Sequence, residues 1–127
     1  MFRVGVDIAD VKQMKRIIAR DGQETFLKKV FTRNEIMRSR KVKNKARYFS
    51  QIFIFKESFV KAKGCGFSNL AQPTDIEVQF SILKPLSGNC KNRIKAYFKK
   101  QKINLINVYY QKLSCDTVSC SLIVDID

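Results

Sequence analysis

The chain has 127 residues, of which 45% are hydrophobic and ten are phenylalanine. This length is enough for one domain with a real core, covering residues 1–127, and the composition excludes a disordered chain. The 25 lysine and arginine residues outnumber the 11 aspartate and glutamate residues, which gives a formal net charge of +14. This charge predicts an anionic partner: a nucleic acid, an acidic protein or a phosphate-rich cofactor, although a merely solvated basic surface would have the same composition.

The chain contains four cysteines, with no Cys-x-x-Cys pair, and no histidine. This pattern favours reduced thiols over a zinc site, and it excludes every catalytic arrangement that needs histidine. Any catalysis would therefore depend on carboxylates, lysines or a metal. No apolar run approaches the length of a membrane span and no signal-peptide pattern opens the chain, so we expect a cytoplasmic protein with no membrane partner.

The first predicted strand covers residues 2–6 and ends in Asp7. Apolar residues then recur at helical spacing from Ala9 to Arg20. A short helix follows around residues 24–30, and Thr32 with Glu35 three residues later has the pattern of a helix-capping box. Nine basic residues and one acid lie between positions 28 and 47, the densest positive segment of the chain.

Residues 49–66 predict the central element, a helix that is apolar almost all round and ends in glycine, and such a helix is buried. Glu57 and Lys61 lie four residues apart, so they project from one face, in the sector of Phe53 and Ile54. The simplest interpretation is an ion pair between these two side chains. The alternative is a site that handles a metal and phosphate.

The C-terminal half predicts mainly strands. Residues 76–80 alternate as a strand does, and a loop with Lys84-Pro85 follows. The spacing of Ile94, Tyr97 and Phe98 predicts a short helix within residues 90–101. Residues 104–113 and 118–126 then read as a hairpin. The elements together predict an α+β domain, with N-terminal helices packed on a small, mostly antiparallel sheet.

Residues 56–66, KESFVKAKGCG, resemble the K-E-[SA]-x-x-K-A-x-G-x-G signature of the 4'-phosphopantetheinyl transferases. Three further pieces occur in the order that this family has: Gly5-Val6-Asp7-Ile8, Phe31-Thr32 with Glu35, and Asp75-Ile76-Glu77-Val78. The short chain resembles the holo-[acyl-carrier-protein] synthase branch. The resemblance implies the fold of that family and a homotrimer with active sites between subunits.

The resemblance also implies a reaction, the magnesium-dependent transfer of 4'-phosphopantetheine from coenzyme A to a serine of apo acyl carrier protein, in support of fatty acid biosynthesis. It assigns the metal to Asp7 and Glu57, and catalysis to Glu57 and Lys61. The expected coenzyme A contacts are Lys56, Lys61, Gly64, Gly66, Lys84 and Pro85. Because carrier proteins are acidic, we expect the basic residues of the first helix to bind them: Lys12, Lys15, Arg16 and Arg20. Without the resemblance, Asp7 could be only a cap and Gly64 only a helix terminator.

Several positions depart from the family pattern. Ile52 and Gln13 stand where the family has arginine, and no histidine occurs near Ser114, where a strand motif of the family has one. The G-K-P segment remains only as Lys84-Pro85. The alternative function is therefore a catalytically weakened relative that acts as a basic carrier-binding or nucleic-acid-binding domain. Nucleic acid is the less expected partner, because the chain has no arginine-glycine repeat, RNA-binding aromatic motif or zinc knuckle.

Overall fold

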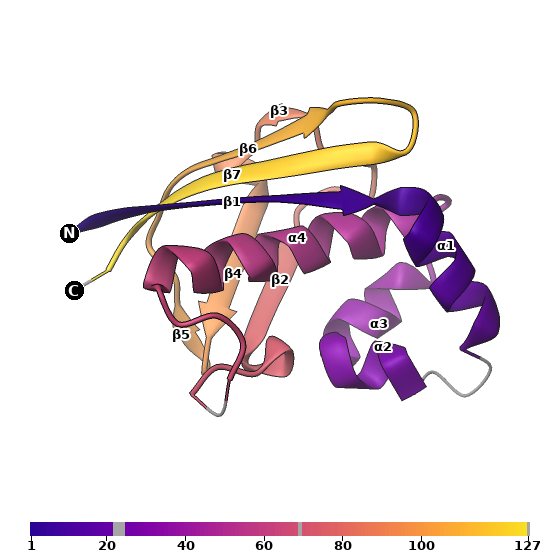
Figure 1. Cartoon of the computed structure of the whole chain (residues 1–127), viewed down its shortest axis with the longest axis horizontal. Coiled ribbons are helices and arrows are strands. Elements are labelled where there is room, and N and C mark those ends of the chain that lie inside the picture. Colours follow the sequence, from indigo (N-terminus) through magenta and orange to yellow (C-terminus); the bar gives the residue numbers. More distant parts are fainter. Residues whose placement is uncertain (22–24, 69, 127) are drawn as a thin grey trace.

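The structure, a computed structural model, describes residues 1–21, 25–68 and 70–126. These described residues form two antiparallel sheets and four α-helices, as the α+β prediction requires (Figure 1). The larger sheet has the order β1 (Phe2–Asp10), β7 (Thr117–Asp125), β6 (Leu105–Lys112) and β3 (Gly88–Asn89). The smaller sheet has the order β2 (Ile76–Phe80), β4 (Ile94–Phe98) and β5 (Gln101–Lys102). The helices are α1 (Val11–Arg20), α2 (Thr25–Val30), α3 (Arg33–Ser39) and α4 (Lys45–Lys63), and two short 3₁₀ helices occupy Pro73–Asp75 and Lys91–Arg93.

Helix α4 is the central element, and it packs against β1 and β7 of the larger sheet and also contacts β2 (Figure 1). Its burial confirms the prediction, because buried residues occur from Ala46 to Ala62 and four of them have no exposed surface: Ile52, Ile54, Phe55 and Val60. The helix begins at Lys45, earlier than predicted, because the Asn44 side chain accepts a hydrogen bond from the Arg47 N–H. It ends at Gly64, whose φ of 79° is left-handed.

Strand β1 is longer than predicted. It pairs with β7 along its full length, so Asp7, opposite Cys120, lies inside the strand and not at its end. The Asp10 side chain then accepts hydrogen bonds from the Lys12 and Gln13 N–H groups and begins α1. The prediction that the strand stops at Asp7 is therefore wrong, because its ladder with β7 continues to Asp10.

Strand β1 and helix α4 touch through their backbones at Gly5. A Cβ atom at Gly5 would lie 1.8 Å from the Ser58 carbonyl oxygen, so only glycine allows this approach. Side chains alternate along a strand, and Asp7 therefore projects from the same face as Gly5, toward α4. Asp7 thus comes to lie beside the helix that carries Glu57 and Lys61.

Local signals predicted most of the remaining elements. The capping box is confirmed, since Thr32 and Glu35 exchange side-chain to backbone hydrogen bonds at the start of α3. The strand over residues 76–80 and the C-terminal hairpin are also confirmed. The short helix over residues 90–101 is wrong, because Ile94 and Ala96 are buried on one face of β4 while Lys95 points to solvent. Of the helix predicted over residues 24–30, α2 begins at Thr25, and Glu24 lies outside the described residues.

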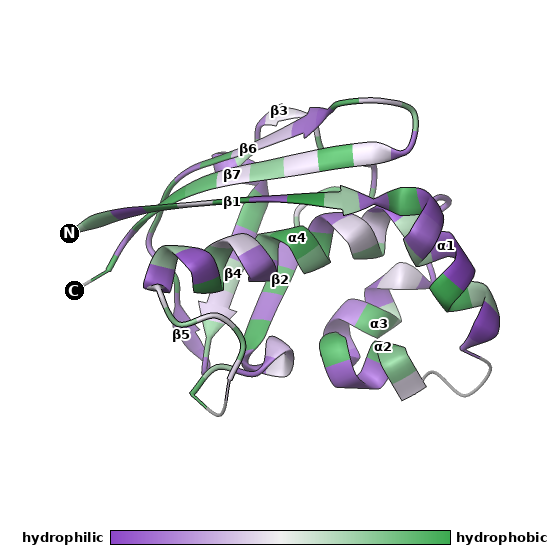
Figure 2. Cartoon of the chain, viewed as in Figure 1, coloured by the Kyte–Doolittle hydropathy of each residue, from purple (hydrophilic) through white to green (hydrophobic). Residues whose placement is uncertain are grey.

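Most large apolar side chains are buried in the core. Hydrophobic and hydrophilic bands occur along α1, α4 and the strands alike (Figure 2). One apolar surface is nevertheless exposed: alternate side chains of β1 lie on the sheet face away from α4, and they are between 50% and 66% exposed. This outer sheet face consists of Phe2, Val4, Val6 and Ile8, with Asn107, Tyr109 and Ile123 on the neighbouring strands. Within the described residues, no helix is both long and apolar enough to cross a membrane.

Candidate active site

Lys61 joins α4 to β1. Its Nζ lies 2.9 Å from Asp7 Oδ1 and 3.4 Å from the Val6 carbonyl oxygen. Among the described residues it forms no ion pair with Glu57, so the simple pairing within the helix is wrong. Lys61 instead neutralises the Asp7 carboxylate on the neighbouring strand. The Lys61 side chain is half-exposed, so this ion pair is accessible to solvent.

Glu57 lies close enough to both Asp7 and Lys61 for their charges to affect its ionisation. Burial raises the pKa of the Glu57 carboxyl above its ordinary value, and the negative charge of Asp7 raises it further. The positive charge of Lys61 opposes this shift. The structure therefore brings together the three residues that sequence reasoning selected as the centre of the site, two carboxylates and one ammonium group.

Two carboxylates are a suitable donor set for magnesium. Asp7 and Glu57 repel each other when both are ionised, and a bound cation would relieve this repulsion. Within the part of the chain that the structure describes, no cluster of three or more histidine, cysteine, aspartate or glutamate side chains could hold a metal. A closed protein cage is therefore not available here. Magnesium commonly binds one or two carboxylates and completes its octahedron with water and phosphate oxygens, which this pair fits.

Lys56 does not lie at this site. Its side chain has no exposed surface, and its Nζ lies 2.7 Å from Glu35 Oε1 and 2.8 Å from the Val30 carbonyl oxygen. The prediction that Lys56 contacts coenzyme A is therefore corrected, because both hydrogen-bond partners of its ammonium group lie inside the protein. Sequence reasoning missed this pair, and the buried helix position of Lys56 is the signal that could have indicated it.

The other predicted coenzyme A contacts are two glycines that follow α4 and two residues of a loop. Gly64 and Gly66 both have left-handed φ angles, and no atom lies within 4 Å of a Cβ built at either. Backbone conformation therefore explains both glycines. Lys84 and Pro85 are exposed in the connection between β2 and β3. Of the positions that depart from the family, Ile52 is fully buried, whereas Gln13 and Ser114 are exposed.

The basic residues of α1 lie beside a second positive segment. The predicted carrier-binding residues of α1, Lys12, Lys15, Arg16 and Arg20, are all exposed. Lys12 and Lys15 line a hollow of about 680 Å³ together with Lys43 and Lys45. Among the described residues that line this hollow, Asp116 supplies the carboxylate, and its Oδ2 lies 3.8 Å from Lys12 Nζ. Folding thus combines two basic segments that are separate in the sequence.

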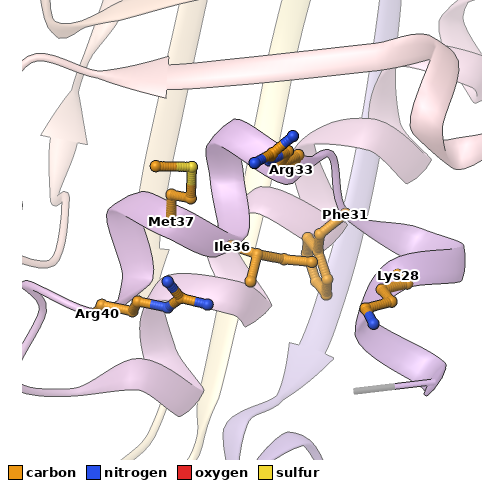
Figure 3. Close-up of a pocket in the computed structure, with 6 residues that line it drawn as sticks. All are labelled: Lys28, Phe31, Arg33, Ile36, Met37 and Arg40. Atoms are coloured by element: carbon orange, nitrogen blue, oxygen red, sulfur yellow. The ribbon is translucent and has the colours of Figure 1, made fainter. Parts of the chain in front are cut away.

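Another hollow, of about 530 Å³, lies on α2 and α3 (Figure 3). Phe31 and Ile36 lie side by side in it, and the Arg40 guanidinium points toward them (Figure 3). The other lining residues are Lys28, Arg33 and Met37. None of its lining residues belongs to the carboxylate centre, so this hollow is separate from the candidate active site.

The coupling between the two carboxylates can be measured. We expect Asp7→Asn to lower the pKa of Glu57, because the negative charge that raises it is removed while Lys61 remains. The pKa should stay above that of an ordinary glutamate, since burial acts independently of Asp7. Carbon-detected NMR titration of the glutamate carboxyls would measure the shift. Asp10→Asn is the matched control, because it removes an exposed carboxylate at the end of the same strand. Equal pKa values of Glu57 in the wild type and in Asp7→Asn would contradict the proximity of the two carboxylates.

Comparison with known proteins places these features in one family. Residues 3–117 match the family described as the 4'-phosphopantetheinyl transferase superfamily. The holo-[acyl-carrier-protein] synthase of Wolbachia pipientis subsp. Culex pipiens (strain wPip) is 40% identical over 103 residues, which cover 78% of this chain and 82% of the relative. The enzyme of the same name from Clostridium tetani is 38% identical over 106 residues, covering 80% of this chain and 81% of the relative.

Solved structures agree with the fold. The crystal structure of holo-[acyl-carrier-protein] synthase from Neisseria meningitidis matches with a TM-score of 0.71 at 18% identity, covering 98% of each chain. The structure from Bacillus anthracis, in complex with CoA (3',5'-ADP), also has a TM-score of 0.71, at 17% identity, and covers 98% of this chain and 96% of that one. Together with the match over residues 3–117 and relatives at 38% and 40% identity, this fold shows that the chain belongs to the holo-[acyl-carrier-protein] synthase branch of the 4'-phosphopantetheinyl transferase superfamily.

Proposed function

We propose that the protein is a magnesium-dependent holo-[acyl-carrier-protein] synthase. It moves 4'-phosphopantetheine from coenzyme A to a serine hydroxyl of apo acyl carrier protein and releases adenosine 3',5'-bisphosphate. In this step a bond forms between the serine oxygen and the phosphorus next to pantetheine, the pyrophosphate bond breaks, and the serine loses its proton. The observation that carries the proposal is the meeting of Asp7, Glu57 and Lys61 at the contact between β1 and α4, in a member of this family.

The chemistry of these three side chains fits phosphoryl transfer. Asp7 and Glu57 would hold the metal, and a bound magnesium ion would supply positive charge to the pyrophosphate. The Lys61 ammonium, next to Asp7 and half-exposed, can neutralise charge that develops on the leaving phosphate. A Glu57 oxygen that is not bound to the metal could accept the serine proton directly or through water.

The first test concerns Glu57. We expect Glu57→Gln to lower kcat by at least about 100-fold, because both a metal ligand and a base are lost while the side-chain volume is kept. Mass spectrometry of an apo carrier protein would measure addition of phosphopantetheine, with Asp10→Asn as the control variant and excess chelator as a second condition. Unimpaired transfer by Glu57→Gln or by chelated wild type would overturn the assignment. A wild type that binds the carrier without modifying it would favour the weakened, carrier-binding alternative.

The carrier surface is proposed to be α1 together with the hollow beside it. Acyl carrier proteins are acidic, and α1 exposes Lys15, Arg16 and Arg20. Lys43 and Lys45 extend the positive surface beyond the helix. Exposed charges of this kind act mainly on association rate and salt dependence, and they are screened over roughly 8 Å at physiological salt.

We expect Lys15→Glu/Arg16→Glu to raise KM for the carrier by about tenfold and to flatten its salt dependence, while KM for coenzyme A changes little. Steady-state kinetics at several salt concentrations would measure both constants. Lys91→Glu/Lys95→Glu is the matched control, since it makes the same charge change at two other exposed lysines. Loss of coenzyme A binding with unchanged carrier affinity would instead assign α1 to the cofactor.

A homotrimer is proposed as the working form, and the outer sheet face supports it. Exposed apolar surface of this kind marks interaction sites. The side-chain oxygen of Asn107, on the same face, is buried without a hydrogen-bond partner, which is unusual for a surface that stays in water.

A cytoplasmic location and a role in fatty acid biosynthesis stay predictions.

We expect the wild type to sediment as a trimer and Val4→Lys/Val6→Lys to sediment as a monomer, because two charges would be buried in the interface. Analytical ultracentrifugation would distinguish the two states. Leu70→Lys is the control, since Leu70 is 72% exposed and lies outside the outer sheet face. A wild-type monomer that transfers phosphopantetheine at full rate would contradict the proposed assembly.

A further inference from the structure

Lys56 and Glu35 form a buried polar centre that the proposed chemistry does not use. Both side chains have no exposed surface. Glu35 Oε1 accepts hydrogen bonds from Lys56 Nζ at 2.7 Å and from the Thr32 N–H at 2.8 Å, and Glu35 Oε2 accepts one from the Val78 N–H at 2.7 Å. This carboxylate therefore ties α4, the start of α3 and strand β2 to one another.

The Lys56 ammonium is held equally firmly on its other sides. It donates to the Val30 carbonyl oxygen at 2.8 Å, and it lies 5.4 Å from the centre of the Phe31 ring. These partners come from the junction between α2 and α3, which is packed into the core through Phe31 and Phe49. The turn of α4 around Lys56 is thus fixed in position relative to that junction.

Glu57 lies between two such anchors. Successive residues of an α-helix are rotated by about 100°, so Lys56 and Ser58 point to nearly opposite sides, with Glu57 between them. On the Ser58 side, the helix backbone touches Gly5 and the Ser58 hydroxyl donates to the Cys120 carbonyl oxygen at 3.3 Å. On the Lys56 side, the helix is held by Glu35 and Val30. Rotation of this turn in either direction would break one set of contacts.

We propose that Lys56 and Glu35 are positioning residues, which set the rotation of α4 so that Glu57 and Lys61 point toward Asp7. This role rests on the proposed function, and it assigns Lys56 to the geometry of the site and not to coenzyme A. Buried ion pairs are often no more stabilising than apolar residues of similar size, so stability alone gives little reason for a charged pair here. A need to orient Glu57 and Lys61 gives a stronger reason for this pair, because a shift of about 1 Å at a reacting group can lower a rate by about 100-fold.

The test compares Lys56→Met with Gln51→Met. Gln51 is a suitable control because it is also buried on α4, and its amide group exchanges two hydrogen bonds with the backbone of Leu86, away from Glu57. Both changes remove a buried anchor, and we expect both to lower the thermal midpoint, by about 10 °C for Lys56→Met. Only Lys56→Met should also lower kcat, by about 10- to 100-fold, with KM for coenzyme A changed less than about twofold.

A second variant keeps the test informative if Lys56→Met does not fold. Glu35→Gln/Lys56→Met leaves no buried charge and keeps an amide oxygen for one of the backbone N–H groups. Its crystal structure needs no substrate, so it tests the geometry even if the transfer assay fails for the wild type. Loss of the 2.9 Å contact between Lys61 and Asp7 would support the positioning role. An unchanged contact, or equal loss of kcat in Lys56→Met and Gln51→Met, would overturn it.

Discussion

The contact between the backbones of Gly5 and Ser58 is the constraint on which the rest of the structure depends. It brings the central helix directly against strand β1, closer than any side chain at position 5 would allow. Asp7 follows Gly5 on the same face, and Glu57 and Ser58 are adjacent on the helix, so this contact brings the two acidic groups close together. The geometry of the candidate site thus depends on two backbones in contact, together with the rotation of α4 about its own axis.

The helices and hairpin could be predicted because their signals are local. Thr32 and Gly64 act within a few residues of their own position, and the burial of α4 follows from its composition; the cap at Asn44 is equally local, but the predicted start at residue 49 missed it. Strand β4 was mistaken for a helix because Ile94, Tyr97 and Phe98 also fit a helical period in so short a segment. Its strand character depends on pairing with β2, which is a partner far away in the sequence.

The site shows a similar division. Asp7 and Glu57 are 50 residues apart in the sequence, so only the family resemblance could bring them together before folding was known. That resemblance records which residues occur in the K-E-S motif but not which way they point. It therefore could not separate Glu57, which faces the strand, from Lys56, which faces the interior. The Glu35–Lys56 pair joins two of the recognised motifs inside the core, and this explains part of the resemblance through folding and not through chemistry.

The outer sheet face has a consequence for how the protein responds to ionic strength. Chains that each carry a formal charge of +14 repel one another, so association through an apolar face works against electrostatic self-repulsion. Added salt screens that repulsion and leaves the apolar contact intact, which favours assembly. The same salt weakens attraction between the basic helix α1 and an acidic partner. In the proposed trimer, self-association and docking of an acidic carrier to α1 would therefore respond to salt in opposite directions.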